Sequence, residues 1–456
     1  MSRPQLRAAS ADRAVRDRAC FEPLAGGRPR RAPMRRRGAA CAWLASAALV
    51  LGLGFAPSAS VAQVAAPILT PTQPPFPAPS PAPSPDWPPP PEAGAIRVAV
   101  FNASLSRRGA GLIWKAILDR QDQVRAFAAI LRDVRADVIA VLELDHDADG
   151  LAVTALAALL AETAPDGTPG LDYAHRYAPE VNTGVPTGLD LDGDGDPAGP
   201  GDAQGYGKFA GQYGIAVLSR LPLDVEAARS FRRTLWSDMP GGLMPTRFYP
   251  REAEGVLRLS SKTHLDLPAV LPDGRRLHLL ISHPTPPVFD GAEDRNGRRN
   301  HDEIRFWADY VSGAGWIRDD AGGEGGLAAG EGFVVLGDLN ADPADGDGRR
   351  EGIRALLTHP RVQDPAPTSP GGAAAAEAQG GANARHRGDP ARDTADWRDE
   401  RGPGNLRVDF ALPSTEWEVT GAGVWWPAPD DPRAELVEGG RLPASSDHRL
   451  VWVDIR

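Results

Sequence analysis

Cysteine is nearly absent from this chain of 456 residues: there are only two, Cys20 and Cys41, and both lie within the first 62 residues. If that segment is removed during export, the remaining protein has no cysteine. This excludes disulfide bonds, a thiol nucleophile and a cysteine-ligated metal from the folded part. Its stability must then come from a large hydrophobic core, to which a bound metal could add.

The chain also lacks an apolar run long enough for a comfortable membrane span. Residues 42–55 are almost wholly apolar, but a spanning helix needs about 20 residues. A basic segment ending in Arg35-Arg36-Arg37 precedes this run, and Ser60-Val61-Ala62 follows it. This order predicts a secretory signal, the alternative being an uncleaved anchor.

The signal region predicted here covers residues 1–62, so we expect a secreted or periplasmic protein without a transmembrane span in its mature form. The basic segment that precedes the apolar run is unusually long for a secretory signal. A chain starting at Met34 would have a conventional signal, which makes Met34 our hypothesis for the true start.

Basic charge is scarce once this region is removed. Residues 1–62 hold 11 arginines and three acidic residues, which leaves 39 basic and 57 acidic side chains and a formal net charge of −18 with histidine neutral. Such a field repels polyanions and gives no counterion-release advantage on nucleic acid. We therefore expect no stable DNA partner, although bound divalent ions could offset the charge locally in a nuclease. We also expect a monomer.

The composition divides the remaining chain into a linker and a folded domain. Proline dominates residues 66–95, which is typical of an extended tether, so residues 63–95 are predicted to be a linker. Residues 96–456 are predicted to form one catalytic domain, and they contain no internal repeat. The hydrophobic share of 42% and the charged share of 24% fit a soluble globular protein.

Hydrophobic patterning predicts a mixture of strands and helices without strict alternation. A hairpin is expected from residues 257–271 and 277–282, around a Pro-Asp-Gly turn. Mixed sheets covered by helices are therefore favoured over a doubly wound parallel sheet. The other strands are expected at residues 96–101, 138–142, 215–218, 333–336, 406–412 and 450–455, the helices at 121–135 and 300–310, and long surface loops at 183–211, 311–331 and 365–404.

The strongest short motif is Gly337-Asp338-Leu339-Asn340, directly after an apolar strand. Two polar residues two positions apart point the same way, here into a cleft. The carboxylate could bind a metal or hold a water, and the amide could orient a phosphate or that water. The alternative is an ordinary Asx turn.

A second motif, Ser446-Asp447-His448, precedes the last strand. An aspartate beside a histidine can fix the imidazole tautomer and contribute to a metal shell, although such pairs are also common on surfaces. Asp409 lies inside an expected strand and needs a buried partner, for which an imidazolium is suitable.

Three further polar residues end strands. Glu143 either caps a helix or binds a hard cation, since carboxylate oxygen suits Mg²⁺, Mn²⁺ or Ca²⁺. Asn102 could supply a neutral oxygen to the same ion. His283 is followed by prolines that would fix the aim of a catalytic imidazole, although a lone histidine at a strand end is more often structural.

Together these residues resemble the endonuclease/exonuclease/phosphatase superfamily of DNase I-like phosphoesterases, over nearly the whole span 96–456. Residues 214–220 resemble an internal strand of the family's fold, and Tyr213, directly before them, would lie near the active site. There are two departures from the family. Leu142 stands where the family commonly has glutamine, so a supporting side chain is missing, and residues 183–211 and 284–301 are elaborated, which leaves the substrate class open. The family's functional positions are matched by Asn102, Glu143, His283, Asp338, Asn340, Asp409, Asp447 and His448.

The resemblance implies a four-layer α/β sandwich, in which two mixed sheets pack face to face with helices outside. It implies Mg²⁺ or Mn²⁺ held by Glu143, with Asn102 and Asp447. Asp338 would hold or deprotonate the attacking water.

The resemblance also assigns the remaining polar residues. Asn340 would orient the attacking water. His283 and His448 would stabilise the charge of the transition state, and Asp409 would orient His448.

One elaborated segment suggests a second, structural Ca²⁺ site. Aspartate alternates along Asp190, Asp192, Asp194 and Asp196, with glycine at the sixth position as in calcium loops. The twelfth position, Gly201, lacks the usual bidentate acid, so a solvated acidic loop is the alternative.

A basic cluster at residues 295–301 follows His283 and stands out in an acidic protein. Arg295 and Arg298 are candidates to neutralise a substrate phosphate, against the alternative of a solvated approach to a helix.

The substrate stays open between two kinds of phosphate ester. The frequency of secreted nucleases favours a nucleic-acid phosphodiester, whereas the charge of −18 and the arginine cluster favour a small phosphoester. A third interpretation is a non-catalytic, Ca²⁺-dependent surface-binding protein on the same fold.

Overall fold

The computed structural model describes residues 87–438 and 444–456. The predicted signal and most of the predicted linker lie outside these residues. Within them, no helix combines the length and apolar character that crossing a membrane requires.

Two mixed β-sheets form the centre of the fold. Each sheet contains one parallel pair, β1 with β2 and β7 with β8, and all its other neighbours are antiparallel. The first sheet has the order β10-β11-β1-β2-β4-β3 and the second β5-β6-β7-β8-β9. The strands are β1 Ile96–Asn102, β2 Val138–Leu142, β3 His175–Tyr177, β4 Ile215–Ser219, β5 Arg229–Ser230, β6 His264–Val270, β7 Arg276–Ser282, β8 Phe333–Asp338, β9 Asp409–Pro413, β10 Val419–Trp425 and β11 Leu450–Ile455.

The central strands β2, β4 and β8 are almost wholly apolar because both faces of each sheet are covered there. In β8, Val334 and Leu336 join the cluster that also holds residues of the first sheet, so the two sheets pack face to face. Phe333 and Val335 point the other way and pack with Trp307 of the helix α4, Arg295–Val311. This period-two division of one strand between two cores explains its continuous hydrophobic run.

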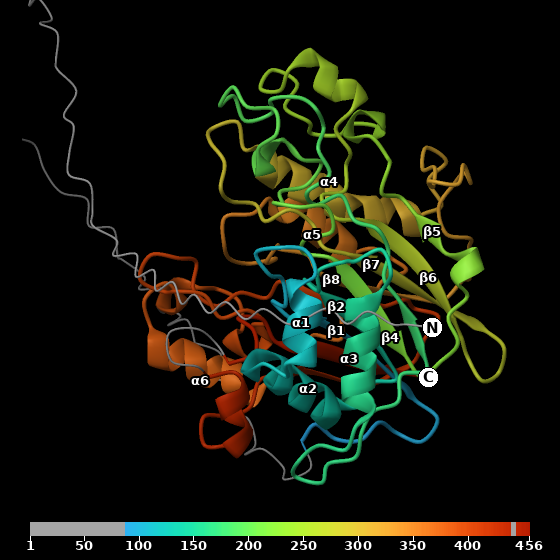
Figure 1. Cartoon of the computed structure of the whole chain (residues 1–456), viewed down its shortest axis with the longest axis vertical. Coiled ribbons are helices and arrows are strands. Elements are labelled where there is room, and N and C mark those ends of the chain that lie inside the picture. The colour runs from blue at the N-terminus through green and yellow to red at the C-terminus, as the bar shows by residue number, and fades with distance from the viewer. Residues whose placement is uncertain (1–86, 439–443) are drawn as a thin grey trace, which may run out of the picture. The chain divides into compact units, whose positions relative to one another are not determined.

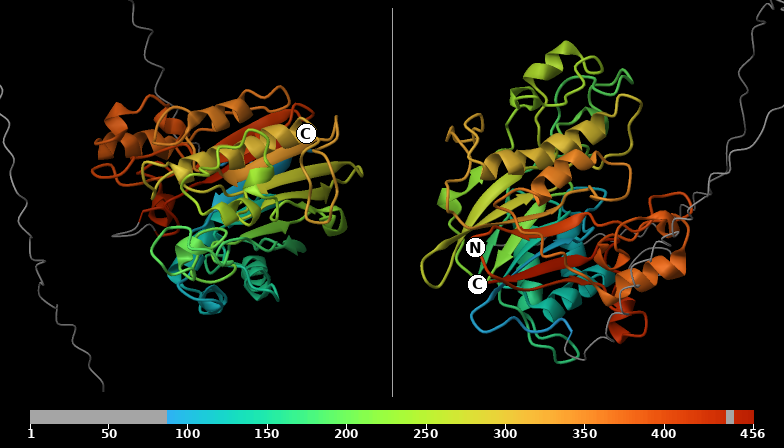
Figure 2. Two further views of the ribbon diagram at one scale, coloured as in Figure 1. Left: turned by 90° about the horizontal axis from the view of Figure 1, so that it is seen from above. Right: turned by 180° about the vertical axis from the view of Figure 1, so that it is seen from behind.

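Helices form the two outer layers. α1 Leu112–Leu118, α2 Asp122–Val134 and α3 Leu151–Ala161 cover the first sheet, and α4 and α5 Arg350–Leu357 lie together on the second (Figures 1 and 2). The predicted fold class, a four-layer α/β sandwich of two mixed sheets, is thereby confirmed.

Two strands begin later than the hydrophobic pattern predicts. β6 starts at His264 rather than at Leu257, because the backbone of residues 257–263 bonds to α4: Leu259 accepts from Arg299 Nε, and Ser261 donates to Glu303 Oε1. β9 starts at Asp409, since the N–H groups of the preceding residues bond to side chains outside the sheet.

A helix, α6 Pro370–Gln379, occupies part of the segment expected to be a loop at residues 365–404. Proline opens it, and the hydroxyl of Ser369 accepts a hydrogen bond from the N–H of Gly372 at 3.1 Å. The loop prediction is wrong here because the Ser369 cap, Pro370 at the first helical position and the alanine run 373–376 favour a helix despite two glycines.

Packing of the domain begins before the first strand. Trp87 lies 6.3 Å from Trp425 and 6.0 Å from Trp452, measured between ring centroids. The end of the segment predicted as linker therefore contributes to the core.

Candidate active site

The polar residues singled out in the sequence lie at the carboxyl ends of two parallel strand pairs, one pair in each sheet. Asn102 ends β1 and pairs with Leu142, so Glu143 follows beside it. His283 follows β7, and Asp338 ends the parallel neighbour β8. Because parallel strands end at the same edge, face-to-face packing of the sheets brings the two edges together.

Asp338 is the centre of this arrangement and is buried. Its Oδ2 accepts a hydrogen bond from Nδ2 of Asn102 at 3.0 Å, which links the two sheets directly. The same Asn102 nitrogen lies 3.3 Å from Oε1 of Glu143. The Nε2 atoms of His283 and His448 lie 3.3 Å and 3.7 Å from Oδ2 of Asp338.

These neighbours determine the charge of Asp338. Burial alone would raise its pKa, but His448, His283 and the hydrogen bond from Asn102 together hold the pKa well below its usual range. Asp338 is therefore ionised at neutral pH.

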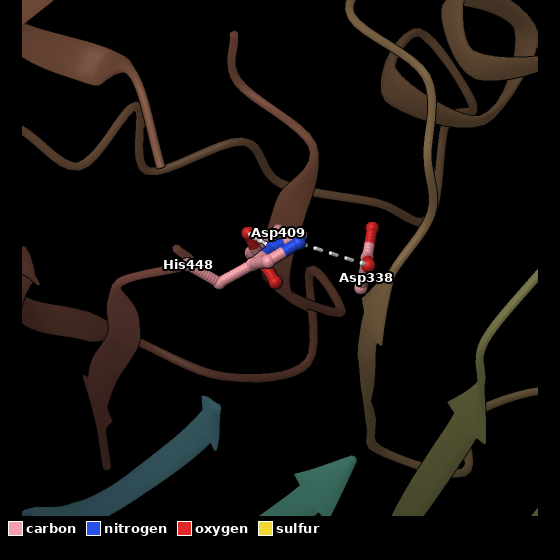
Figure 3. Close-up of side chains that lie close together, drawn as sticks. All are labelled: Asp338, Asp409 and His448. Atoms are coloured by element: carbon pink, nitrogen blue, oxygen red, sulfur yellow. Dashed lines mark hydrogen bonds and ion pairs between the residues drawn. The ribbon is translucent and has the colours of Figure 1, made fainter. Parts of the chain in front are cut away.

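His448 lies between two carboxylates (Figure 3). Its Nδ1 is 2.9 Å from Oδ2 of Asp409, and its Nε2 faces Asp338. Asp409 stands opposite Asp338 in the antiparallel pair β8–β9, and its N–H donates to the hydroxyl of Thr394 at 2.9 Å. Burial opposes the imidazolium, but Asp409 and Asp338 outweigh it and raise the pKa of His448 well above its ordinary value.

Asn340 is both part of an Asx turn and a residue of the cleft, which were the two interpretations of its motif. Its N–H donates to Oδ1 of Asp338 at 2.9 Å, which is the Asx turn, and both residues also line the cleft. Its side-chain amide donates to the carbonyl of Pro284 at 3.2 Å, beside His283. Asn340 thus ties the segment after β8 to the segment after β7.

The predicted metal ligands carry oxygen atoms that are available to a cation. Glu143 and Asp447 both line the cleft with Asp338. Oε2 of Glu143 and Oδ1 of Asp447 accept no hydrogen bond from any residue that the structure describes, whereas Oδ2 of Asp447 accepts from Nε1 of Trp397 at 3.1 Å. Oδ1 of Asn102 accepts from the N–H of Ser104 at 3.2 Å. This oxygen-only donor set fits Mg²⁺ or Mn²⁺.

A second group of donor atoms also lies close together. One ligand atom each from Asp338, Asp409 and His448 falls within 4.8 Å of the others. Because His448 is directed at a carboxylate through each ring nitrogen, this trio is better suited to holding a proton than a cation.

Backbone strain gathers at the cleft. Of the nine non-glycine residues with positive φ in the described chain, five line it. Such conformations cost about 1–3 kcal/mol each and cluster where function requires them. The five are Ser104, Glu143, Tyr213, Phe289 and Asn340.

The predicted substrate-binding residues are only partly brought together. Tyr213 and Arg295 line the cleft, but Arg298 does not. The basic cluster forms the first turns of α4, so successive side chains point in directions about 100° apart. Arg298 Nε donates to the carbonyl of Glu293 instead.

Other residues of the cleft were not predicted from the sequence. It has a volume of about 1600 Å³, and the segment after α6, expected to be a surface excursion, supplies one wall. The cations Lys262 and Arg299 line it as well, and Arg299 is occupied by backbone carbonyls, including that of Gln204. Isolated arginines in a glycine- and alanine-rich segment give no periodic signal, which is why this wall was missed; it includes Arg385, Trp397, Arg398 and Arg401.

The predicted calcium segment is an irregular, partly exposed loop. Ligand atoms of Asp190, Asp192 and Asp194 lie within 4.8 Å of one another, and Asp196 is not part of this group. Asp190 already accepts from the N–H groups of Gly193 and Gly195, at 2.7 Å and 3.0 Å. A calcium ion at this loop stays a prediction.

Comparison with known proteins gives one family match. The model of the Endonuclease/Exonuclease/phosphatase family matches residues 113–448. No curated protein matches the chain.

Several solved structures are similar at low identity. An endonuclease/exonuclease/phosphatase from Beutenbergia cavernae is 19% identical, covering 79% of this chain and 71% of that one, with a TM-score of 0.45. Sphingomyelinase C from Streptomyces griseocarneus is 15% identical, with coverages of 79% and 99% and a TM-score of 0.41. The human Nocturnin catalytic domain is 13% identical, with coverages of 79% and 94% and a TM-score of 0.39.

Proposed function

Because the chain belongs to the Endonuclease/Exonuclease/phosphatase family, we propose that it is a phosphoesterase that requires a divalent metal and acts outside the cytoplasm. The observation that supports the hydrolytic part is the network around Asp338, in which one ionised carboxylate contacts an amide and two imidazoles. The basic, apolar and small-residue order of residues 1–62 supports export.

Asp338 holds the attacking water in this proposal. The low pKa of Asp338 makes it a weak base but keeps it ionised. Its carboxylate therefore accepts a hydrogen bond from the water and directs the water oxygen at phosphorus. Asn340 fixes the turn that directs this carboxylate.

The two histidines act on the phosphate. His448 is an imidazolium at neutral pH and donates to a non-bridging oxygen, where negative charge develops. Asp409 Oδ2, 2.9 Å from Nδ1 of His448, orients the ring and stabilises its positive charge. His283 lines the cleft with its Nε2 3.3 Å from Oδ2 of Asp338, and from Nε2 it would pass a proton to the leaving oxygen as the ester bond breaks.

Glu143, Asp447 and Asn102 would hold the divalent metal. When bound, Mg²⁺ or Mn²⁺ withdraws charge from a phosphate oxygen and offsets the acidic field of the cleft.

The cleft favours a phosphodiester over a small monoester. Its volume of about 1600 Å³ exceeds the roughly 300–1,000 Å³ typical of small-molecule sites. The arginines along its wall suit further anionic groups on either side of the scissile ester. We accordingly place the substrate among phosphodiesters with substantial groups on both oxygens.

Hydrolysis of a mixed panel tests this proposal. Plasmid DNA, RNA, bis-nitrophenyl phosphate, nitrophenyl phosphate and inositol phosphates are offered with Mg²⁺, Mn²⁺, Ca²⁺ or EDTA. We expect metal-dependent cleavage of the diesters and nucleic acids. Phosphate release from the monoesters alone would make the protein a phosphatase, and calcium binding without turnover would favour the surface-binding alternative.

Two substitutions test the site itself. Asp338→Ala and His448→Ala should each lower kcat by at least roughly 100-fold, the usual scale for removing a positioned catalytic group. Their circular dichroism should match that of the unmodified protein. Unchanged turnover in either variant would refute the assignment.

A further inference from the structure

Lys262 is a buried cation of the cleft to which the reaction above assigns no role. The chain uses arginine 47 times and lysine only three times, at positions 115, 208 and 262. Lys115 and Lys208 are exposed, whereas Lys262 is 7% exposed and lines the cleft together with Glu143 and Asp338.

The ammonium group of Lys262 has no partner within the described chain. No described residue accepts a hydrogen bond from it or forms an ion pair with it. Glu303, the nearest candidate by charge, is already engaged: its Oε1 accepts from the N–H of Ser261 and its Oε2 from the N–H of Thr285, both at 2.6 Å. A buried lysine with a purely structural role would be expected to donate to a carbonyl or carboxylate.

The backbone that carries Lys262 is held on several sides. Its carbonyl accepts from the N–H of Asn182 at 2.9 Å, and Nδ2 of Asn182 donates to the carbonyl of Ser260 at 2.8 Å. A Cβ on Gly205 would stand 1.9 Å from the carbonyl oxygen of Ser261, so this glycine permits a close approach. The side chain therefore starts from a fixed point beside the site.

The charge of Lys262 lacks a close anion. Burial lowers its pKa, and Glu303, Glu143 and Asp338 oppose that effect from a distance. A metal ion held by Glu143 would neutralise part of the negative charge that Glu143 presents to Lys262. Metal binding therefore cannot supply the anion that the ammonium group lacks. An incoming phosphate brings the missing negative charge.

We propose that Lys262 binds a non-bridging oxygen of the substrate's phosphate group, next to the metal ligands. This rests on the proposed function, since it concerns the phosphate of that substrate. The ammonium is a compact point charge with three donors, which suits contact with a single phosphate oxygen.

Inorganic phosphate is the probe for the test. Its binding in saturating Mg²⁺ is measured by titration calorimetry for the unmodified protein, Lys262→Met, Lys262→Arg and the control Lys208→Met, which removes the same charge outside the cleft. Loss of a charge-assisted hydrogen bond should weaken binding in Lys262→Met roughly 10- to 100-fold. Lys262→Arg should recover part of it, and Lys208→Met should bind like the unmodified protein.

The same variants are assayed for hydrolysis and for Mg²⁺ dependence. KM for the diester should rise in Lys262→Met, while the half-saturating Mg²⁺ concentration stays unchanged or falls. Unaltered phosphate binding in Lys262→Met, or a defect cured by more Mg²⁺, would overturn the proposal, as would absence of phosphate binding by the unmodified protein.

Failure of the proposed function has a different signature. If phosphate binds through Lys262 but no ester is hydrolysed, the enzymatic proposal fails and the binding role stands. If esters are hydrolysed and Lys262→Met retains its KM, the binding role fails and the enzymatic proposal stands.

Discussion

A carboxylate that contacts an amide and two imidazoles stays ionised far into the acid range, and Asp338 is in this position. Its neighbour His448 is affected in the opposite direction, since two carboxylates favour its protonated form. The site therefore keeps one of two adjacent groups as an anion and the other as a cation; in the proposed reaction the anion would hold the water and the cation would contact the phosphate.

The raised pKa of His448 predicts a pH dependence. Activity that needs the imidazolium is present below its folded pKa and is lost as pH rises through that value, which lies above 6.5. Asp409→Asn removes the carboxylate that supports the imidazolium, so the alkaline decline of kcat should move to lower pH, by roughly one unit or more. Profiles of kcat between pH 5 and 10 measure this, and an unmoved decline would argue that His448 does not titrate in the reaction.

Removal of one oxygen ligand gives a prediction about the metal. Glu143→Gln keeps the size of the side chain but loses its charge, so the Mg²⁺ or Mn²⁺ concentration for half-maximal activity should rise about 10-fold or more. Glu226→Gln, an exposed glutamate, is the matched control. Identical metal titrations of the two variants would contradict the ligand role.

At the residue level, the sequence most readily reveals the site residues that terminate or adjoin apolar strands. Asn102, Glu143, His283 and Asp338 each follow a hydrophobic run, so their position can be read directly. Lys262 ends no strand, because residues 257–263 lie outside the sheet. Site residues on such irregular segments can be identified only from the structure.

At the scale of elements, the site depends on how closely β7 and β8 approach each other. A Cβ on Gly337 would stand 2.4 Å from the carbonyl oxygen of Ser282, the last residue of β7. The two residues that follow this contact, His283 and Asp338, face each other across 3.3 Å. Gly337 therefore allows the close approach that separates the His283 and Asp338 side chains by 3.3 Å.

Gly337→Ala should lower the free energy of unfolding by roughly 1–3 kcal/mol, because backbone must move to admit the methyl group. Activity should fall as well, since the same movement separates His283 from Asp338. Urea denaturation and kcat of this variant are compared with those of Gly255→Ala, whose Cβ would meet no atom within 4 Å. Equal stability of both variants would show that the contact is easily relieved.

Element prediction from the sequence succeeded where burial is two-sided and failed where side chains organise the backbone. β2 appears at the expected residues, and β8 begins at the expected Phe333 and extends two residues further, to Asp338. The late start of β6 could not be foreseen, because the bonds that hold residues 257–263 come from α4, far along the chain.

At the scale of the whole molecule, the helix α4 covers the second sheet and also connects segments that are distant in sequence. Its Glu303 joins the segments that carry Lys262 and Thr285, and the carbonyl of Glu303 lies 2.7 Å from Nε2 of His264. His264 is fully enclosed, and burial lowers its pKa to about 4.

This histidine predicts loss of global stability in acid. The folded pKa lies below the unfolded value of 6.5, so the unfolded chain takes up the proton first, and stability falls as pH drops from 6.5 to about 4. The fully buried ring makes this loss about 3 kcal/mol at most. Unfolding free energies from urea titrations at several pH values should show a shallower acid slope for His264→Gln than for the unmodified protein; equal slopes would contradict the prediction.

The hydroxyl of Ser446 donates to the carbonyl of Asn102 at 2.7 Å, across 344 positions of the chain. The earliest and latest residues of the candidate site therefore meet only when β1 and β11 are paired. A growing chain carries Asn102 long before His448 exists, so the candidate site stays incomplete until the last strand has been synthesised. A product truncated before Ser446 lacks Asp447 and His448, so under the proposed function it should have no phosphoesterase activity.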